Sequence, residues 1–365
     1  MNPNKIKSIQ HLGQSIWLDF FDREIMDSGK LKELIENDGV NGVTSNPSIF
    51  EKAIDSSSDY NEDIATLSQQ KSSIEEVFLG LEVKDIKRAA DFFKPVYERT
   101  NGMDGFVSLE VSPRLAHDTE GTINQAREFW KAVSRKNVMI KIPSTAEGLP
   151  AIRKCISAGI NINITLLFGL PRYEQVTDAY ISGLEDRMKA NQPIDQIASV
   201  ASFFLSRIDV LIDPLLEEKG LGQMKGEVAI ASAKKAYEIY KKIFTSERFK
   251  KLEANGAKRQ RVLWASTSSK DPSFSDVKYV EALIGAETIN TIPIETLEAF
   301  NDHGNAESHL EDDLDNATHL MAKLKENGID IDTITQRLED EGIEKFNKAY
   351  DKLLKTIEKQ KQVAY

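Results

Sequence analysis

Residues 137–168 read NVMIKIPSTAEGLPAIRKCISAGININITLLF, and they carry the clearest signal for the fold. The stretch begins and ends with short apolar runs rich in β-branched residues, which are typical of strands buried on both faces. Between these runs, residues 145–158 repeat apolar positions at the spacing of an amphipathic helix. A strand, a helix and a second strand in this order predict a parallel α/β fold.

The alternation of short apolar runs and helical patterns continues along most of the chain. Helical spacing recurs in residues 119–136 and 226–244. Eight runs have the composition and the bounding turn residues of strands: SIWLDF (15–20), NGVTS (41–45), GFVSLEV (105–111), NVMIKIP (137–143), NINITLLF (161–168), IASVASFF (197–204), RVLWAST (261–267) and TINTIP (288–293). We therefore predict a (β/α)8 TIM barrel. An open doubly wound sheet is the alternative, but its usual glycine-rich turn does not follow the first strand.

The chain is longer than a minimal barrel, and the additional length is concentrated in a few places. A barrel of this kind takes about 250 residues, whereas the chain has 365. The extra residues fall in two insertions, about 47–104 and 205–260, and in a charged tail, about 294–365, all with helical patterns. Since no Pro/Ser-rich linker or repeat separates them, we expect one domain, residues 1–365, with extra helices.

Charge and composition narrow the classes of partner. A formal net charge of −11 argues against nonspecific nucleic-acid binding, which requires clustered Lys and Arg. No window is apolar enough for a membrane span, and the N-terminus lacks the apolar core of a signal peptide. The single cysteine, Cys155, fits a reducing compartment. From these features we expect a cytoplasmic protein. We also expect no metal site, because the five scattered histidines lack metal-ligand spacing.

Charged and amide side chains interrupt several predicted strands near their carboxyl ends. Asp19, Glu110 and Lys141 are ionisable, and Asn163 and Thr165 share one strand. Buried ionised groups are costly unless they are paired. Because barrel active sites lie at the carboxyl ends of the strands, polar residues recurring at that end predict a functional site.

Lys141 is the most informative of these residues. It stands between two isoleucines and precedes Pro143, at a strand end. An amine removed from water loses its proton more easily and attacks carbonyl groups. A lysine that simply emerges into solvent is the plain alternative, and the presence of Asp19 and Glu110 argues against it.

Two carboxylates and an amide are candidates for the chemistry around Lys141. Asp19 and Glu110 can move protons to and from hydroxyl groups, as Schiff-base chemistry requires. Alternatively, one of them only balances the lysine charge in a buried salt bridge. Asn46 precedes a proline and so prefers an extended backbone, which turns its amide towards the barrel mouth. An Asn-Pro pair also commonly starts a turn.

Hydroxyl and cationic residues follow the sixth and seventh predicted strands. Ser202 and Arg207 offer a hydroxyl and a guanidinium that can hold a phosphate. The alternative is a surface ion pair of Arg207 with Asp209 or Asp213. The segment WASTSSK (264–270) adds hydroxyls and a lysine, and the loops after strands seven and eight often bind phosphate in barrels.

Together these segments resemble transaldolase. The motifs that carry the resemblance are WLDF with Asp19, GVTSNPSIF with Asn46, VSLEVSPRLAHDT with Glu110, VMIKIPST with Lys141, NITLLF with Thr165, and ASFFLSRID with Ser202 and Arg207. They lie between about residues 10 and 305. The length and the long insertions look like the longer bacterial branch of that family.

The resemblance implies a class I aldol mechanism, without metal or cofactor, in the non-oxidative pentose phosphate pathway. It implies that Lys141 forms a Schiff base with the C2 ketone of sedoheptulose 7-phosphate or fructose 6-phosphate. Asp19 then takes the C4 hydroxyl proton as the C3–C4 bond breaks. Glu110 acts through a water that Thr165 positions. The dihydroxyacetone unit passes to glyceraldehyde 3-phosphate or erythrose 4-phosphate, so that sedoheptulose 7-phosphate and glyceraldehyde 3-phosphate give erythrose 4-phosphate and fructose 6-phosphate.

The resemblance also assigns contacts to these sugar-phosphate substrates. The residues are Asn46 and Asn163 for the hydroxyls, and Ser202, Arg207 and Ser266 for the phosphate. One position departs from the family pattern, because many relatives carry an arginine shortly after the strand-seven serine. Here Ser268 stands at about that place, and the nearest cation is Lys270. Either Lys270 supplies a point charge, or the loop holds it away.

Two other functions fit part of this pattern. A fructose-6-phosphate aldolase would use the same lysine and barrel but release free dihydroxyacetone, and the long insertions favour transaldolase over it. A noncatalytic sugar-phosphate-binding barrel would need neither the lysine nor the carboxylates, and all three are present. A monomer and a homodimer are both compatible with the sequence.

Overall fold

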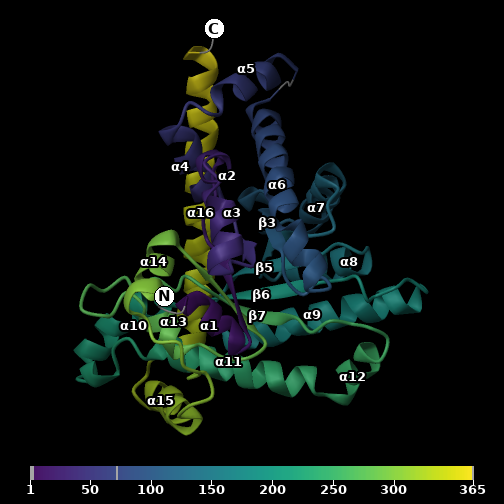
Figure 1. The fold of residues 1–365 in the computed structure, drawn as a ribbon. Helices are drawn as coiled ribbons and strands as arrows, with labels where there is room; N and C mark the ends of the chain where they lie inside the picture. The colour runs from purple at the N-terminus through teal and green to yellow at the C-terminus, as the bar shows by residue number, and fades with distance from the viewer. Residues whose placement is uncertain (1–3, 71–72, 364–365) are drawn as a thin grey trace.

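The computed structural model describes residues 4–70 and 73–363. Within these ranges, eight parallel strands close into a barrel in chain order (Figure 1). The strands are β1 (Gln14–Leu18), β2 (Gly42–Val43), β3 (Phe106–Glu110), β4 (Val138–Pro143), β5 (Ile162–Leu167), β6 (Ser199–Phe204), β7 (Arg261–Ala265) and β8 (Thr288–Ile292). The predicted TIM barrel is confirmed, and each predicted run overlaps one strand.

Helices surround the barrel and account for most of the remaining chain. Before β5 they are α1 (Lys5–His11), α2 (Arg23–Asp27), α3 (Lys30–Glu33), η1 (Leu34–Asp38), α4 (Pro47–Ser56), α5 (Asn61–Gln70), α6 (Ile74–Arg99), η2 (Pro113–Leu115), α7 (Thr119–Val133) and α8 (Gly148–Ser157). After β5 they are α9 (Leu170–Lys189), α10 (Ser206–Glu218), η3 (Gly222–Met224), α11 (Val228–Phe244), α12 (Glu247–Glu253), α13 (Lys278–Ala282), α14 (Ile294–His303), α15 (Leu314–Glu326) and α16 (Ile331–Val363). No helix of the described ranges is long and apolar enough to cross a membrane.

Two of the three predicted helices differ from the structure at an end where the backbone turns left-handed. α7 ends at Val133 rather than residue 136, because Ser134 adopts a φ of 50° and caps the helix. α11 begins at Val228 rather than residue 226, because Gly226 has a φ of 71°. Glycine reaches this region without strain, so it commonly marks such ends.

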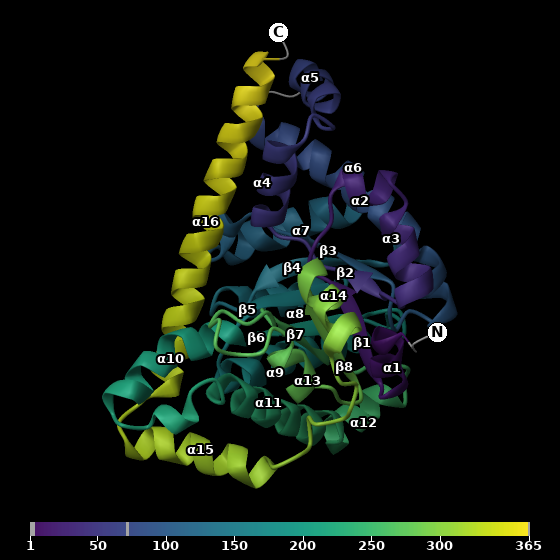
Figure 2. The same ribbon diagram turned by 60° about the vertical axis from the view of Figure 1, so that its left-hand side comes forward.

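Helices α4, α5 and α6 of the first insertion pack with α16 of the tail at one end of the barrel. Figures 1 and 2 show α16, the long yellow helix, running past the barrel and alongside α4 and α5. α16 also contacts α6, α10, η2 and β5. Its amino-terminal part is tied to α9, where Arg172 Nε lies 3.3 Å from Glu339 Oε2. One domain with added helices stays our prediction for this arrangement.

A buried polar cluster closes the opposite end of the barrel, where the strands begin. The carboxylate of Asp104 lies 3.1 Å from Arg261 Nη2 and accepts hydrogen bonds from Ser15 Oγ (2.5 Å) and Trp17 Nε1 (2.9 Å). Above it, an apolar layer fills the barrel; its members are Trp17, Phe106, Met139, Ala198, Val200, Leu263, Ala265 and Ile289. These side chains leave the carboxyl ends of the strands as the open end of the barrel.

Candidate active site

Lys141 lies inside the barrel mouth and is withdrawn from water. It is the fourth residue of β4 and is 4% exposed. Its Nζ donates a hydrogen bond to the carbonyl of Ser45 (3.1 Å) and lies 3.2 Å from Glu110 Oε2. The strand register places Glu110 directly beside Lys141. The amine is therefore buried and ion-paired, which excludes a lysine that only emerges into solvent.

Two carboxyl groups interact with the charge of Lys141. Burial raises the pKa of Glu110, the lysine charge opposes this shift, and the charge of Asp19 adds to it. Burial also raises the pKa of Asp19, while Lys141 and a hydrogen bond from Thr44 oppose that shift. Carboxyl groups with raised pKa values beside an amine are suited to exchanging protons near neutral pH.

Asp19 is held at the mouth by residues from two neighbouring strands. It follows the last residue of β1. Thr44, just after β2, donates a hydrogen bond from Oγ1 to Asp19 Oδ1 (2.9 Å), and its Oγ1 also lies 2.8 Å from Thr291 Oγ1 of β8. These contacts hold Asp19 through Oδ1, and the residue lines the pocket above Lys141.

A pocket of about 860 Å³ opens above Lys141, and we call it the mouth pocket. Its lining includes Asp19, Thr44, Asn46, Lys141, Ser202, Arg207, Ser266, Ser268, Lys270, Thr291 and Phe346. The structure thus brings together six of the nine residues that the sequence singled out. Glu110, Asn163 and Thr165 lie behind this surface rather than on it.

Besides Lys141, the mouth pocket has two cationic side chains, Arg207 and Lys270, which are placed for an anion. Burial lowers the pKa of Lys270, and the charge of Arg207 lowers it further, so the two side chains are close enough to repel each other. Arg207 is exposed and makes no ion pair within the described ranges. The alternative of a surface pair is wrong: Asp209 instead accepts from Ala229 N and Tyr279 Oη, and Asp213 from Gly226 N.

The backbone near these cations adds further donors. Arg207 lies in the first turn of α10, where backbone N–H groups point outward and favour anions. Ser266 follows β7 with a φ of 56°, and its hydroxyl lies 2.9 Å from that of Ser206. A non-glycine residue held in the left-handed region is uncommon, and such strain is often found at functional sites.

Asn163 lies one layer deeper, in a network that fixes its amide. It is beside Lys141 in the register of β4 and β5. Its Nδ2 donates to Ser108 Oγ (2.9 Å), and its Oδ1 accepts from Ser202 Oγ (2.6 Å). The hydroxyl proton of Ser202 therefore forms a hydrogen bond inside the barrel. Thr165 is fully buried, and its Oγ1 has no hydrogen-bond partner among the described residues.

Asn46 both starts a turn before Pro47 and lies at the barrel mouth, the two alternatives that the sequence left open. Its Oδ1 accepts hydrogen bonds from the backbone N–H groups of Ser48 (3.0 Å) and Ile49 (3.1 Å), so it caps α4. The same side chain lines the mouth pocket. The cap uses the oxygen, which leaves the amide NH2 as the end that can donate to a ligand.

Several residues of the mouth pocket were not singled out by the sequence, among them Thr44, Thr291 and Phe346. Thr44 and Thr291 lie at strand ends, and Thr44 is part of the GVTSNPSIF motif. Phe346 comes from α16, far along the chain, and reaches the pocket because that helix crosses beside β5. No local pattern distinguishes it from the other aromatic residues of an amphipathic helix.

Comparisons with known proteins agree with this geometry. Residues 16–357 match the family described as Transaldolase/Fructose-6-phosphate aldolase. A transaldolase of Trichodesmium erythraeum is 48% identical over 371 aligned positions, which cover 98% of each chain. A transaldolase 2 of Nostoc punctiforme is 46% identical over 372 positions, and a transaldolase of Saccharopolyspora erythraea is 45% identical over 359, each covering 98% of both chains.

Proposed function

The chain belongs to the transaldolase/fructose-6-phosphate aldolase family, and we propose that it is a transaldolase that works through a Schiff base on Lys141. The observation that carries this proposal is the buried Lys141 amine, 3.2 Å from Glu110, at the base of a pocket that also exposes Asp19. An amine in such surroundings can attack a ketone once a neighbour takes its proton.

Schiff-base formation is the first step of the proposed reaction. Glu110 accepts a proton from the Lys141 ammonium, and the free amine adds to the C2 carbonyl of a ketose phosphate. Glu110 then returns the proton to the departing oxygen, which leaves as water. The raised pKa of Glu110 suits a group that both accepts and donates. The orphan hydroxyl of Thr165 supports its role in holding the participating water.

Carbon–carbon cleavage is the second step, and we assign it to Asp19. Its carboxylate takes the proton of the C4 hydroxyl as the C3–C4 bond breaks, and the Schiff base accepts the electron pair as an enamine. The aldose phosphate departs, and the three-carbon unit stays on Lys141. The reverse sequence on a second aldose phosphate completes the transfer. The hydrogen bond from Thr44 orients Asp19 for both cleavage and formation of the C3–C4 bond.

The substrate contacts are assigned from the positions of the side chains in the mouth pocket and behind it. Asn46 and Asn163 are assigned to the hydroxyls of the three-carbon unit. The phosphate end is assigned to Ser202, Ser266, Arg207 and Lys270, all of which line the mouth pocket. Lys270 supplies the charge that many relatives take from an arginine, because it lines the pocket beside Arg207. We place the reaction in the cytoplasmic non-oxidative pentose phosphate pathway, from sedoheptulose 7-phosphate and glyceraldehyde 3-phosphate to erythrose 4-phosphate and fructose 6-phosphate.

Omission of the acceptor tests transfer against simple aldol cleavage. With fructose 6-phosphate alone, a transaldolase releases at most about one equivalent of glyceraldehyde 3-phosphate per site. Addition of erythrose 4-phosphate should start multiple turnovers and produce sedoheptulose 7-phosphate. Free dihydroxyacetone accumulating at the same rate without an acceptor would make the protein an aldolase instead.

A further inference from the structure

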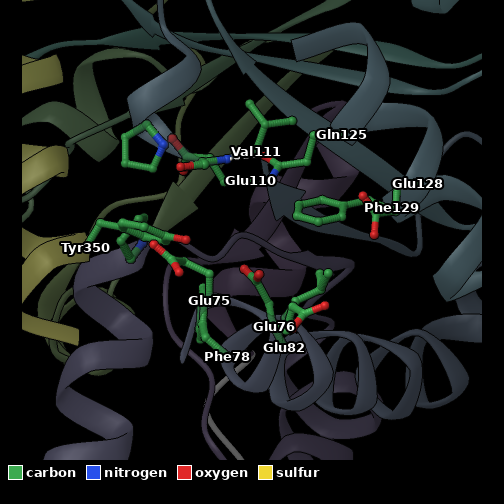
Figure 3. A pocket seen from close by; sticks show the side chains of 14 residues that line it. Glu75, Glu76, Phe78, Glu82, Glu110, Val111, Gln125, Glu128, Phe129 and Tyr350 are labelled. Carbon is green, nitrogen blue, oxygen red and sulfur yellow. Dashed lines mark hydrogen bonds between the residues drawn. The ribbon is translucent and has the colours of Figure 1, made fainter. Parts of the chain in front are cut away.

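A second pocket, which we call the rear pocket, lies behind Glu110. It has an empty volume of about 670 Å³ and is lined by side chains of α6, β3, α7 and α16, among them Leu79, Glu82, Glu110, Glu128 and Tyr350. Figure 3 shows Glu76 and Glu82 on one side and Glu110 on the other, with Tyr350 and Phe129 at the two ends. Glu110 thus lines the rear pocket and does not line the mouth pocket.

The ion pair of Lys141 and Glu110 separates the two pockets. Lys141 lines the mouth pocket and Glu110 lines the rear pocket, although their charged atoms are 3.2 Å apart. A sugar phosphate bound above Lys141 fills the mouth pocket, and Phe346 of α16 adds to its wall. The rear pocket therefore gives Glu110 contact with water while the mouth is occupied.

Glu82 is an unpaired acid in the wall of this second pocket. It is 4% exposed and has neither a hydrogen bond nor an ion pair within the described part of the chain. Asp85, one turn further along α6, is paired with Arg23 at 2.9 Å. Burial raises the pKa of Glu82 well above its usual value, and the charges of Glu110 and Asp85 raise it further. Burial without a partner and the neighbouring carboxylates thus favour the protonated form of Glu82, in which it can donate a hydrogen bond.

The other acidic groups of the rear pocket make interactions outside it or are exposed to solvent. Glu75 pairs with Arg114 at 2.9 Å, and Glu76 forms the capping box that begins α6. Glu128 is exposed. Burial raises the pKa of Tyr350 to about 12, so its hydroxyl stays neutral. A buried, protonated carboxyl without a partner has a cost, and a water bound between Glu82 and Glu110 would offset it.

We propose that the water that Glu110 uses in Schiff-base formation and hydrolysis enters and leaves through the rear pocket. Glu82 is a positioning residue that donates a hydrogen bond to this water on the rear side of Glu110, while Thr165 holds it on the other side. The inference rests on the Lys141 Schiff base proposed above. Each Schiff base formed from the amine and the C2 ketone releases one water, and each one hydrolysed consumes one water. The rear pocket takes up and supplies that water, and Glu110 moves the proton.

The rate of covalent trapping tests this role separately from bond cleavage. Fructose 6-phosphate is mixed with enzyme and quenched with borohydride at increasing times, and the fraction of modified Lys141 is measured. Glu82→Leu should slow the approach to the end point several-fold, the loss expected for one hydrogen bond between neutral groups. The end point itself should stay unchanged. Glu82→Gln retains an N–H donor and should restore a rate close to that of the unmodified protein.

Matched variants make the result specific to the rear pocket. Glu128→Gln removes an exposed carboxylate from the same pocket and should leave the trapping rate unchanged. Leu79→Trp narrows the rear pocket and leaves its carboxyl groups unsubstituted, so it should slow trapping several-fold. This variant tests the role of the rear pocket if Glu82→Leu does not fold.

The overturning results differ from those that would remove the Schiff base itself. A normal trapping rate in Glu82→Leu would contradict the proposal. If Glu82→Leu does not fold, a normal trapping rate in Leu79→Trp would contradict it. A Glu82→Gln rate as slow as that of Glu82→Leu would contradict the donor role. Absence of any adduct on the unmodified protein would instead reject the proposed function.

Discussion

Lys141 Nζ lies 3.2 Å from Glu110 Oε2, and the two residues are partners in the register of neighbouring strands. Because each residue lines a different pocket, the pair lies between the mouth pocket and the rear pocket. A buried pair of this kind is costly to desolvate, and breaking it by removing one partner leaves an uncompensated charge. Such a pair is better explained by proton exchange than by stability.

Thr44→Val should shift the acidic limb of the kcat profile to higher pH. Asp19 acts as a base when ionised, so activity is lost as pH falls through its pKa. The Thr44 hydrogen bond lowers that pKa, so its removal should raise the pKa further. The pH dependence of transfer measures the shift. Thr122→Val, a buried hydroxyl bonded to Leu115 O away from the site, should leave the profile in place.

Lys270→Met should weaken binding of the phosphate with little change in kcat. A hydrogen bond to a charged group contributes about 1.5–3 kcal/mol, so the KM for fructose 6-phosphate should rise about tenfold or more. Reaction with unphosphorylated fructose should not change. Lys225→Met is the matched control, because Lys225 pairs with Glu217 in the adjoining pocket. An unaltered KM would place the phosphate elsewhere.

Phe346→Ala should increase release of the three-carbon unit to water. The ring forms part of the mouth-pocket wall, and its removal admits water above the enamine. We expect free dihydroxyacetone, measured without acceptor, to rise several-fold relative to transfer. Phe92→Ala removes a partly buried ring of α6 that lines none of the pockets described here and should leave this ratio unchanged. Equal ratios in both variants would mean that α16 does not shield the site.

Asp104→Ala should destabilise the protein without changing its chemistry. The substitution leaves Arg261 buried without its partner and removes the acceptor for Ser15 and Trp17. The cost should be about 3–5 kcal/mol in the free energy of unfolding, measured by urea denaturation. Since this cluster lies at the amino-terminal end of the strands, KM and kcat per folded molecule should be unaffected. A changed KM would show coupling between the two ends.

The barrel could be predicted because its strands are short apolar runs bounded by turn residues, a pattern set locally. The proximity of Asp19, Glu110 and Lys141 also follows from sequence, since parallel strands in a barrel bring their carboxyl ends together. Helix ends were less accurate, because Ser134 ends α7 through a left-handed backbone that propensity alone does not indicate.

Other features depend on packing between distant segments and have no local signal. Phe346 reaches the mouth pocket only because α16 crosses beside β5. Glu82 has the sequence context of an ordinary helix glutamate, and its burial beside Glu110 appears only when α6 packs on β3. The place of Lys270 depended on a loop conformation, for which sequence left two alternatives open.

Borohydride reduction with fructose 6-phosphate, followed by peptide mapping, tests the central claim most directly. The account predicts a single covalent three- or six-carbon adduct on Lys141, formed only with substrate and absent in Lys141→Ala, which should lose transfer activity. Glu110→Gln should still form the adduct, but more slowly. An adduct on another lysine, or undiminished transfer by Lys141→Ala, would contradict the account.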